Sequence, residues 1–255
     1  MENPLPQSNL GAPPLTRRLA EIATLSDDEI NILNGLQANC RTIKRHRDVT
    51  TEGRKHGSLF IVLEGIGVRY RILRDGRRQI INIVLPGDFV GFHAACFENT
   101  LYSTKALTEM TISTVPSARL SSVLQTCPQL IAKILCFISH EGATHIEHIV
   151  DLGRRSALER IAHFFLELLY RLRAVGMAEE DSYWIPLTQE LIGDALGLSV
   201  PHVNRVLRRL REDDLVTVED QRVTIKNIDA LAELADFEPG YLRRFGIREM
   251  LEEAA

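Results

Sequence analysis

Between residues 187 and 218 the apolar positions recur at the spacing of two short helices, with a tight break at Gly197 to Ser199. Thr188 is placed to cap the first helix, and Ser199 is placed to cap the second. The second helix has one apolar side, formed by Val203, Val206, Leu207 and Leu210, and an opposite side with Pro201, His202, Arg205, Arg208 and Arg209. A helix-turn-helix with a basic outer face is typical of proteins that read DNA.

A predicted hairpin follows this pair of helices. The segments 215–218 and 222–225 have strand character and flank Glu219, Asp220 and Gln221, so we expect them to form a wing. Residues 200–211 contain no acidic side chain, although the whole chain has a net charge of −4. An isolated run of arginines is usually a solvated surface. Together with the caps, the break and the hairpin, this run favours a DNA-binding segment.

The hydrophobic period changes along the rest of the chain and predicts an α+β fold. Residues 40–118 alternate like short strands joined by glycine turns, which favours an antiparallel β-roll. A long helix from 129 to about 152 has a narrow apolar stripe, which is typical of a helix that pairs with a second copy. Ser156 and Glu159 form a capping box that starts the next helix, so Gly153, Arg154 and Arg155 are the predicted hinge.

These patterns predict five consecutive regions. They are a flexible arm (1–14), a β-roll sensor domain with flanking helices (15–127), a dimerisation helix with hinge (128–153), a winged helix-turn-helix DNA-binding domain (154–228) and a helical C-terminal extension (229–255). No functional role is assigned to residues 237–241.

Composition narrows the class of protein. A chain of 255 residues with 45% hydrophobic and 25% charged residues is typical of a soluble protein of about two domains. Because the net charge is −4, affinity for DNA must come from a local patch and must depend on salt. We expect a cytoplasmic protein without a membrane partner, because the N-terminus lacks a secretion signal, no apolar run reaches about 20 residues, and the four cysteines are far apart. No catalytic constellation stands out, so we expect no enzyme.

The histidines and cysteines suggest a metal, haem or redox site, which we do not favour. His140, His145 and His148 share one predicted helix, and His93 lies in a predicted loop, so a metal or haem could be held there. Solvated or interface histidines are commoner, and we predict no cofactor, with haem or another effector as the alternative. Cys96 and Cys127 are expected to be small buried hydrophobic residues rather than redox centres.

The order of roll, long helix, hinge and winged helix resembles the Crp/Fnr superfamily of bacterial transcription factors. The resemblance covers roughly residues 20–228 and rests on the segments 87–91, 149–162 and 188–210. It implies a homodimer whose two recognition helices enter successive major grooves, about 34 Å apart, on a near-palindromic DNA site. It also implies RNA polymerase as a partner.

The resemblance assigns roles to individual DNA-domain residues. Arg205 matches the guanine-reading arginine of the family, and Thr188 and Ser199 match positions that hold phosphates. Gln189, Arg208 and Arg209 are expected to contact phosphate or groove atoms. The chain departs from the family where Pro201 replaces a base-reading glutamate, so His202 or Asn204 is expected to read a different base.

The sensory half departs further from the family pattern. Positions that hold the ribose and phosphate of a cyclic nucleotide in the family correspond to Gly91, Phe92, Tyr102 and Ser103, and a base-contacting position corresponds to His145. A phosphate diester would lack its arginine there, so we predict no cAMP binding.

An iron–sulfur centre of the fumarate–nitrate regulator type is not expected either, because only Cys40 precedes the middle of the roll. The effector remains open. Two alternatives to a signal-responsive regulator also remain: a small-molecule sensor module that acts through protein contacts, and a ligand-independent regulator controlled by its abundance.

Overall fold

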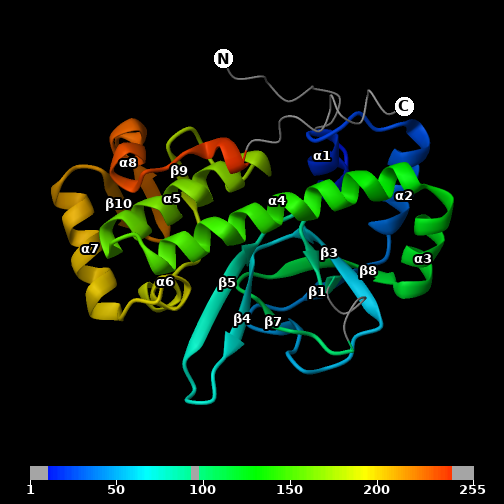
Figure 1. The fold of residues 1–255 in the computed structure, drawn as a ribbon, viewed down its shortest axis with the longest axis horizontal. Coiled ribbons are helices and arrows are strands. Elements are labelled where there is room, and N and C mark those ends of the chain that lie inside the picture. The colour runs from blue at the N-terminus through cyan, green and yellow to red at the C-terminus, as the bar shows by residue number, and fades with distance from the viewer. Residues whose placement is uncertain (1–10, 93–97, 243–255) are drawn as a thin grey trace. The chain divides into compact units, whose positions relative to one another are not determined.

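The computed structural model describes residues 11–92 and 98–242, which divide into two compact units (Figure 1). The roll unit comprises the described parts of residues 11–69 and 83–140. The carboxyl-terminal unit comprises residues 70–82 and 141–242. The long helix therefore belongs to both units. Most of the predicted arm, residues 1–10, lies outside the described residues.

The roll is built from two four-stranded sheets with strand orders β1-β8-β3-β6 and β2-β7-β4-β5, and the hairpin end of β4 and β5, residues 70–82, belongs to the carboxyl-terminal unit. The strands are β1 (Cys40–Ile43), β2 (Asp48–Thr50), β3 (Ser58–Glu64), β4 (Gly67–Ile72), β5 (Arg78–Val84), β6 (Phe89–Val90), β7 (Ser103–Ala106) and β8 (Met110–Pro116). Strand β8 pairs antiparallel with β1 and β3, and β2 pairs antiparallel with β7. The predicted antiparallel roll is confirmed.

Helices cover one apolar face of the roll. They are α1 (Pro14–Ala20), α2 (Asp27–Leu36), α3 (Ser117–Thr126) and the first half of α4 (Pro128–Gly153). A core of buried side chains from these helices and from β3 and β6 includes Leu15, Leu33, Ile61, Phe89, Leu130 and Phe137. The Lys133 ammonium lies 2.7 Å from the Glu29 carboxylate, which ties α4 to the capping-box turn of α2.

The long helix α4 extends for 26 residues. Several of its apolar side chains are exposed, because no other described residue covers them. They are Leu135, Ile146, Ile149, Val150 and Leu152. Within residues 11–92 and 98–242, no single helix is long and apolar enough to cross a membrane. Among these residues, one pair of helical segments, 117–123 and α4, is long and apolar enough when the two are taken together, but the two segments are bent by 115° relative to each other.

The carboxyl-terminal unit continues with helices and a small sheet. Its elements after α4 are α5 (Ala157–Ala174), β9 (Ser182–Trp184), α6 (Gln189–Leu196), α7 (Val200–Glu212), β10 (Val216–Glu219), β11 (Arg222–Ile225), α8 (Ile228–Ala235) and η3 (Pro239–Leu242). The predicted capping box is confirmed, because Ser156 accepts from the Glu159 amide and the Glu159 carboxylate accepts from the Ser156 amide at 2.6 Å.

One local prediction in this unit was wrong, and one element was not predicted. The wing turn has two residues instead of three, because Glu219 pairs with Arg222 and leaves Asp220 and Gln221, both in the left-handed region, as the turn. Such turns match the twist of antiparallel strands. The acidic segment before the helix-turn-helix also contains a strand, β9, which joins the wing as a third strand beside β11. A three-residue strand whose partner lies about 40 residues later cannot be predicted from the local sequence pattern.

The predicted helical extension is helical only in part. α8 ends at Ala235, Asp236 adopts the left-handed conformation, and a short 3-10 turn, η3, follows. Residues 243–255 of the extension lie outside the described residues.

Candidate DNA-binding surface

The break between α6 and α7 is fixed by backbone geometry. Gly197 ends α6 with a φ of 66°, a left-handed conformation that costs glycine little. Gly193, one turn earlier, lies so close to the loop that a Cβ atom would meet the Leu198 carbonyl oxygen at 2.5 Å. Thr188 caps α6 as predicted, because its hydroxyl accepts from the Leu191 amide at 3.2 Å. The connection between the two helices is therefore tight, and they pack against each other.

Helix α7 has one buried side and one solvent side, as its sequence predicts. Val203, Val206 and Leu210 are buried, and α7 packs against α5 and α6. Arg205 and Arg208 are exposed, and within the described residues neither makes a hydrogen bond or an ion pair. Arg209 has a weak exposed contact of 3.5 Å with Asp213, and Pro201 is exposed in the first turn. The outer face thus presents uncompensated positive charge.

The predicted cap by Ser199 is half right. Ser199 occupies the N-cap position of α7, but its side chain makes no capping bond. Pro201 is the second residue of the helix and has no N–H, while the amide of His202 donates to the Ser199 backbone carbonyl at 2.9 Å. Because both amides that a cap hydroxyl normally binds are absent or engaged, the Ser199 hydroxyl stays available at the exposed start of α7.

The start of α6 and the solvent face of α7 are brought together. The Asn204 amide donates to the Gln189 side-chain oxygen at 3.4 Å, so two predicted contact residues on different helices are neighbours. Thr188 is exposed beside Gln189, and His202 is half-buried in the first turn of α7. Eight predicted DNA contacts therefore lie on these two helices and at their N-termini.

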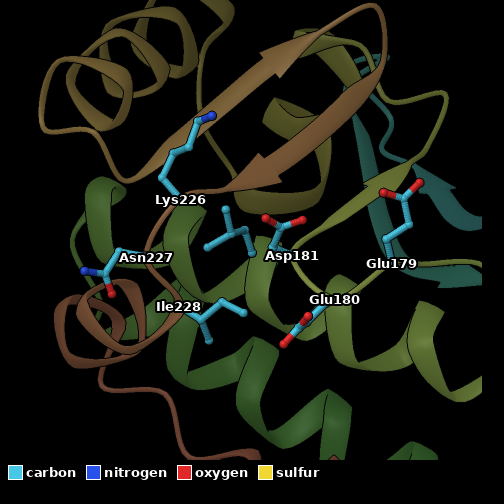
Figure 2. Close-up of a pocket in the computed structure, with 7 residues that line it drawn as sticks. Glu179, Glu180, Asp181, Lys226, Asn227 and Ile228 are labelled. Atoms are coloured by element: carbon cyan, nitrogen blue, oxygen red, sulfur yellow. The ribbon is translucent and has the colours of Figure 1, made fainter.

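An acidic hollow lies elsewhere on the same unit, between the segment before β9 and the start of α8 (Figure 2). Its lining includes Glu179, Glu180 and Asp181, with Lys226 and Asn227 across from them. The Glu179 carboxylate is 3.0 Å from Arg222, and this contact lowers the pKa of Glu179. Carboxylates repel phosphate, so the three acidic residues of this hollow disfavour DNA binding there.

The predicted hinge is an ion-paired corner rather than a loose linker. Gly153 is the last residue of α4, and the Arg154 amide still donates to the Val150 carbonyl at 2.8 Å. The Arg155 guanidinium lies 2.9 Å from Asp151 and 3.0 Å from Glu147 on α4. Burial by itself would lower the pKa of Arg155, but these two carboxylates raise it. The corner between α4 and α5 is therefore held by charge.

A second buried charge cluster follows along the same helix pair. The Glu167 carboxylate of α5 is fully buried and lies 2.9 Å from the His148 ring and 3.1 Å from the Arg171 guanidinium. Burial would raise the pKa of Glu167, but His148 and Arg171 lower it to about 2. Burial would lower the pKa of His148, and Glu167 raises it instead. Arg171 also donates to the Asn82 side chain at 2.7 Å.

The end of the β4–β5 hairpin, which belongs to the same unit, bonds to α6. The Arg78 guanidinium lies 2.6 Å from Asp194, and the Gln79 amide donates to the Ala195 carbonyl at 3.0 Å. Sequence reasoning missed these contacts, because the partners lie more than a hundred residues apart. For the buried cluster a signal did exist: His163 and Glu167 interrupt the apolar side of α5, and such polar positions are buried only with partners.

Two family models match the chain. The Crp-like helix-turn-helix domain matches residues 159–234, and the cyclic nucleotide-binding domain matches residues 40–127. The nitrogen fixation regulation protein FixK of Bradyrhizobium diazoefficiens is 33% identical over 177 residues, which are 69% of this chain and 71% of the relative. The chain belongs to the Crp/Fnr family.

Other members of the Crp/Fnr family are similar over most of the chain. The transcriptional activator protein Anr of Pseudomonas aeruginosa is 28% identical over 83% of this chain and 86% of its own length. The solved structure of FixK2 from Bradyrhizobium japonicum superposes with a TM-score of 0.68 at 25% identity, covering 76% of this chain and 96% of that one. This Crp/Fnr protein is a transcription regulator with a DNA-binding helix-turn-helix.

The roll of this Crp/Fnr protein places four of its predicted ligand positions in one unit. Gly91 is buried with a φ of 79°, Phe92 is half-buried, and Tyr102 and Ser103 are buried. The Ser103 hydroxyl accepts from the Glu52 amide at 3.0 Å, so it is engaged within the protein.

A buried arginine of the roll lies beside these positions. The Arg69 guanidinium lies 5.7 Å from the centre of the Tyr102 ring and donates to the Phe89 carbonyl. Sequence reasoning did not single out Arg69, because it alternates with Val68 and Tyr70 as a solvent-facing strand residue would. The fifth predicted position, His145, belongs to the carboxyl-terminal unit.

His148, one of the histidines that could hold a metal, is engaged within the protein. His148 contacts the Ile81 carbonyl at 3.2 Å as well as Glu167. Among residues 11–92 and 98–242, no group of three histidine, cysteine or acidic side chains is arranged to hold a metal ion. His93 and Cys96 lie outside the described residues, and Cys127 is half-buried against the core of the roll.

Proposed function

We propose that this regulator is a homodimer that reads a near-palindromic operator with Arg205 in the major groove. The observation that carries the proposal is the solvent face of α7, where Arg205 and Arg208 are exposed and have no partner among the described residues. Surface arginines without an internal partner are available to bind guanine edges and phosphates. The buried side of α7 anchors this face to the rest of the unit.

The dimer is proposed to form through α4. Its exposed apolar residues recur at helical spacing, and Ile149 and Ile146 leave 69% and 63% of their surface in solvent. Large exposed apolar side chains in a row mark a protein interface more often than a solvated helix. A second copy of α4 would cover them and would set the two recognition helices one helical turn of DNA apart.

Base reading is proposed to involve Arg205 together with His202 and Asn204. Pro201 offers no hydrogen-bonding group at the position where the family has a glutamate. Asn204 is exposed and adjoins Gln189, so an amide is present to bind an adenine edge. We therefore expect an operator half-site that shares the guanine read by Arg205 and differs at the neighbouring base pair.

Phosphates are proposed to contact the helix N-termini and the flank of α7. The helix dipoles at the starts of α6 and α7 favour an anion, and the Ser199 hydroxyl is available there. Thr188 and Gln189 would act at the start of α6, with Arg208 and Arg209 along α7. These contacts fix the register on DNA and carry no sequence information by themselves.

The signal is proposed to act in the roll or in α4 and to change the corner at Gly153, Arg154 and Arg155. Tyr102 and Ser103 occupy the positions where the family binds the phosphate of a cyclic nucleotide, and neither is an arginine. We therefore propose that the signal is not cAMP. We also propose that the five regions expected from the sequence are the functional domains of the protein. The protein would act in the cytoplasm with RNA polymerase as its partner, and would catalyse no reaction.

Selection of bound sequences from a random DNA pool tests this function. The full-length protein should enrich a near-palindromic site, and Arg205→Ala should lose discrimination at one base pair in each half-site. One bidentate arginine–guanine contact is worth about 1–3 kcal/mol, which predicts a loss of about 5- to 150-fold in affinity for that site. Arg74→Ala, an exposed arginine of the β4–β5 turn, is the matched control.

Two outcomes would overturn the proposal. If Arg205→Ala enriches the same site with the same preference, Arg205 does not read a base. If the wild-type protein enriches no sequence at moderate salt, the winged helix serves protein contacts, and the sensor-module alternative is favoured.

A further inference from the structure

The segment Asp236–Leu242, here called the strap, covers the buried side of the corner between α4 and α5 (Figure 1, orange to red). Asp236 ends α8 in the left-handed conformation with a φ of 48°, and the Phe237 amide donates back to the Ala232 carbonyl at 2.9 Å. This turn reverses the chain and directs it onto α5, with which η3 is in contact.

The strap binds the corner at the backbone as well as through side chains. The guanidinium of Arg155, which already binds two carboxylates of α4, donates to the Asp236 carbonyl at 3.3 Å. The Phe237 side chain is buried, with its ring centre 5.1 Å from that of His163 and 5.5 Å from that of Tyr170. One turn of chain thus contacts both the corner arginine and the buried side of α5.

Tyr241 completes the contact. Its ring is parallel to the His163 ring within 5°, with the centres 6.1 Å apart, and its hydroxyl lies 3.5 Å from the Glu167 carboxylate. Burial raises the pKa of Tyr241, and the carboxylates of Glu167 and Glu147 raise it further, so the phenol keeps its proton and donates to Glu167.

His163 links this segment to α4. The ring is fully buried, 3.1 Å from Asp151 and 3.5 Å from Glu147, which are the carboxylates that bind Arg155. The strap therefore packs on a side chain of α5 that lies against both carboxylates of α4. A charged cluster of this kind holds one geometry only while its neighbours stay in place.

We propose that Phe237 and Tyr241 are positioning residues for DNA binding, because the strap holds the angle between α4 and α5. Helix α5 packs against α7, so a change at this corner moves the recognition helix relative to α4. The proposal rests on the proposed function, in which α4 pairs two copies. Loss of the strap would leave α7 folded but would let its position relative to the dimer axis vary.

Hydrogen exchange of the free full-length protein tests the strap without DNA. In Tyr241→Ala, the amides of residues 150–158 should exchange at least about tenfold faster than in the wild type, while those of α7 stay unchanged. Tyr241→Phe keeps the ring and should restore slow exchange. Glu238→Ala, an exposed position within the strap, is the matched control and should leave exchange unchanged. Unchanged exchange at 150–158 in Tyr241→Ala would overturn the proposal.

Spacing preference then tests the effect on DNA. The selected operator is compared with the same operator carrying one extra base pair between its half-sites. Wild type and Glu238→Ala should strongly prefer the selected spacing, whereas Tyr241→Ala and Phe237→Ala should lose at least about threefold of that preference. A variant that is merely less folded would bind both operators more weakly by the same factor, and that result would overturn the positioning role.

The two measurements separate this proposal from the proposed function. If the wild type shows no spacing preference, the proposal that a dimer reads two half-sites is wrong. The proposal that the strap positions α7 for DNA binding is then wrong as well. The exchange measurement still decides whether the strap holds the corner.

Discussion

Two regions of the carboxyl-terminal unit use charged side chains in opposite ways. On the solvent face of α7, Arg205 and Arg208 are exposed and have no partner among the described residues. Where α4 packs on α5, Arg155 and Arg171 are each bound by a carboxylate, and Glu167 is fully buried. The first arrangement leaves charge for a molecule outside the protein. The second uses charge to hold two helices together.

The difference teaches how residue type and burial must be considered together. Exposed charges cost little and add little to stability, so they can be reserved for an external anion. Buried charges are tolerated only when each has partners, and removing one leaves the other uncompensated. Substitutions on α7 should therefore change binding, whereas substitutions at the corner should change stability.

The largest effect is expected from Glu167→Gln, which removes one buried charge and keeps the shape of the side chain. His148 and Arg171 then lose their carboxylate, and we expect a loss of about 3–5 kcal/mol in the free energy of unfolding, measured with urea. Glu190→Gln is the control, because its 3.5 Å contact with Arg78 is exposed and should be worth less than about 1 kcal/mol. Equal costs at the two sites would contradict the comparison.

The pH dependence of that difference sharpens the result. The pKa of Glu167 is lowered in the folded protein to about 2 from 4.5, so its charge stabilises the folded state above about pH 4.5. That contribution is lost as the pH falls toward 2. The gap in stability between wild type and Glu167→Gln should therefore narrow when unfolding is measured at successively lower pH.

An intermediate effect is expected from two hydroxyls at helix starts. Thr188→Ala removes a side-chain cap and should cost about 1 kcal/mol of stability. Ser199→Ala removes a hydroxyl that makes no capping bond, so its stability should change by less than about 0.5 kcal/mol while its affinity for DNA falls. Urea unfolding and titration with the selected operator measure the two quantities. A stability loss in Ser199→Ala as large as that in Thr188→Ala would show that the hydroxyl caps α7.

The smallest effect is expected from Arg208→Ala, which should leave stability unchanged. If Arg208 binds one phosphate, the slope of log affinity against log salt should become shallower by about 0.9, and specific and random DNA should lose affinity alike. Arg74→Ala should leave the slope unchanged. A loss confined to the selected operator would instead make Arg208 a base-reading residue.

The sequence alone predicted the roll, the long helix, the capping box at Ser156 and the two helices of the DNA-binding segment. Each of these depends on hydrophobic period or on a cap a few residues away, so the signal is local. The Ser199 side-chain bond was wrong because Pro201 removes one amide, a detail that becomes decisive only in three dimensions. Strand β9 was missed because its partner, β11, lies about 40 residues later in the chain. The two-residue wing turn was missed because a sequence pattern does not place a strand end to within one residue.

The periodicity of α7 determined on its own which side chains would face solvent, because a regular helix converts spacing directly into direction. Only the tertiary structure decided which charged side chains would be buried and paired inside the protein. The sequence marks His163 and Glu167 as polar positions on the apolar side of α5, but only the packing of α4, α5 and Tyr241 gives them their partners. Partners that lie far apart in the chain meet only through packing, and no local pattern specifies that meeting.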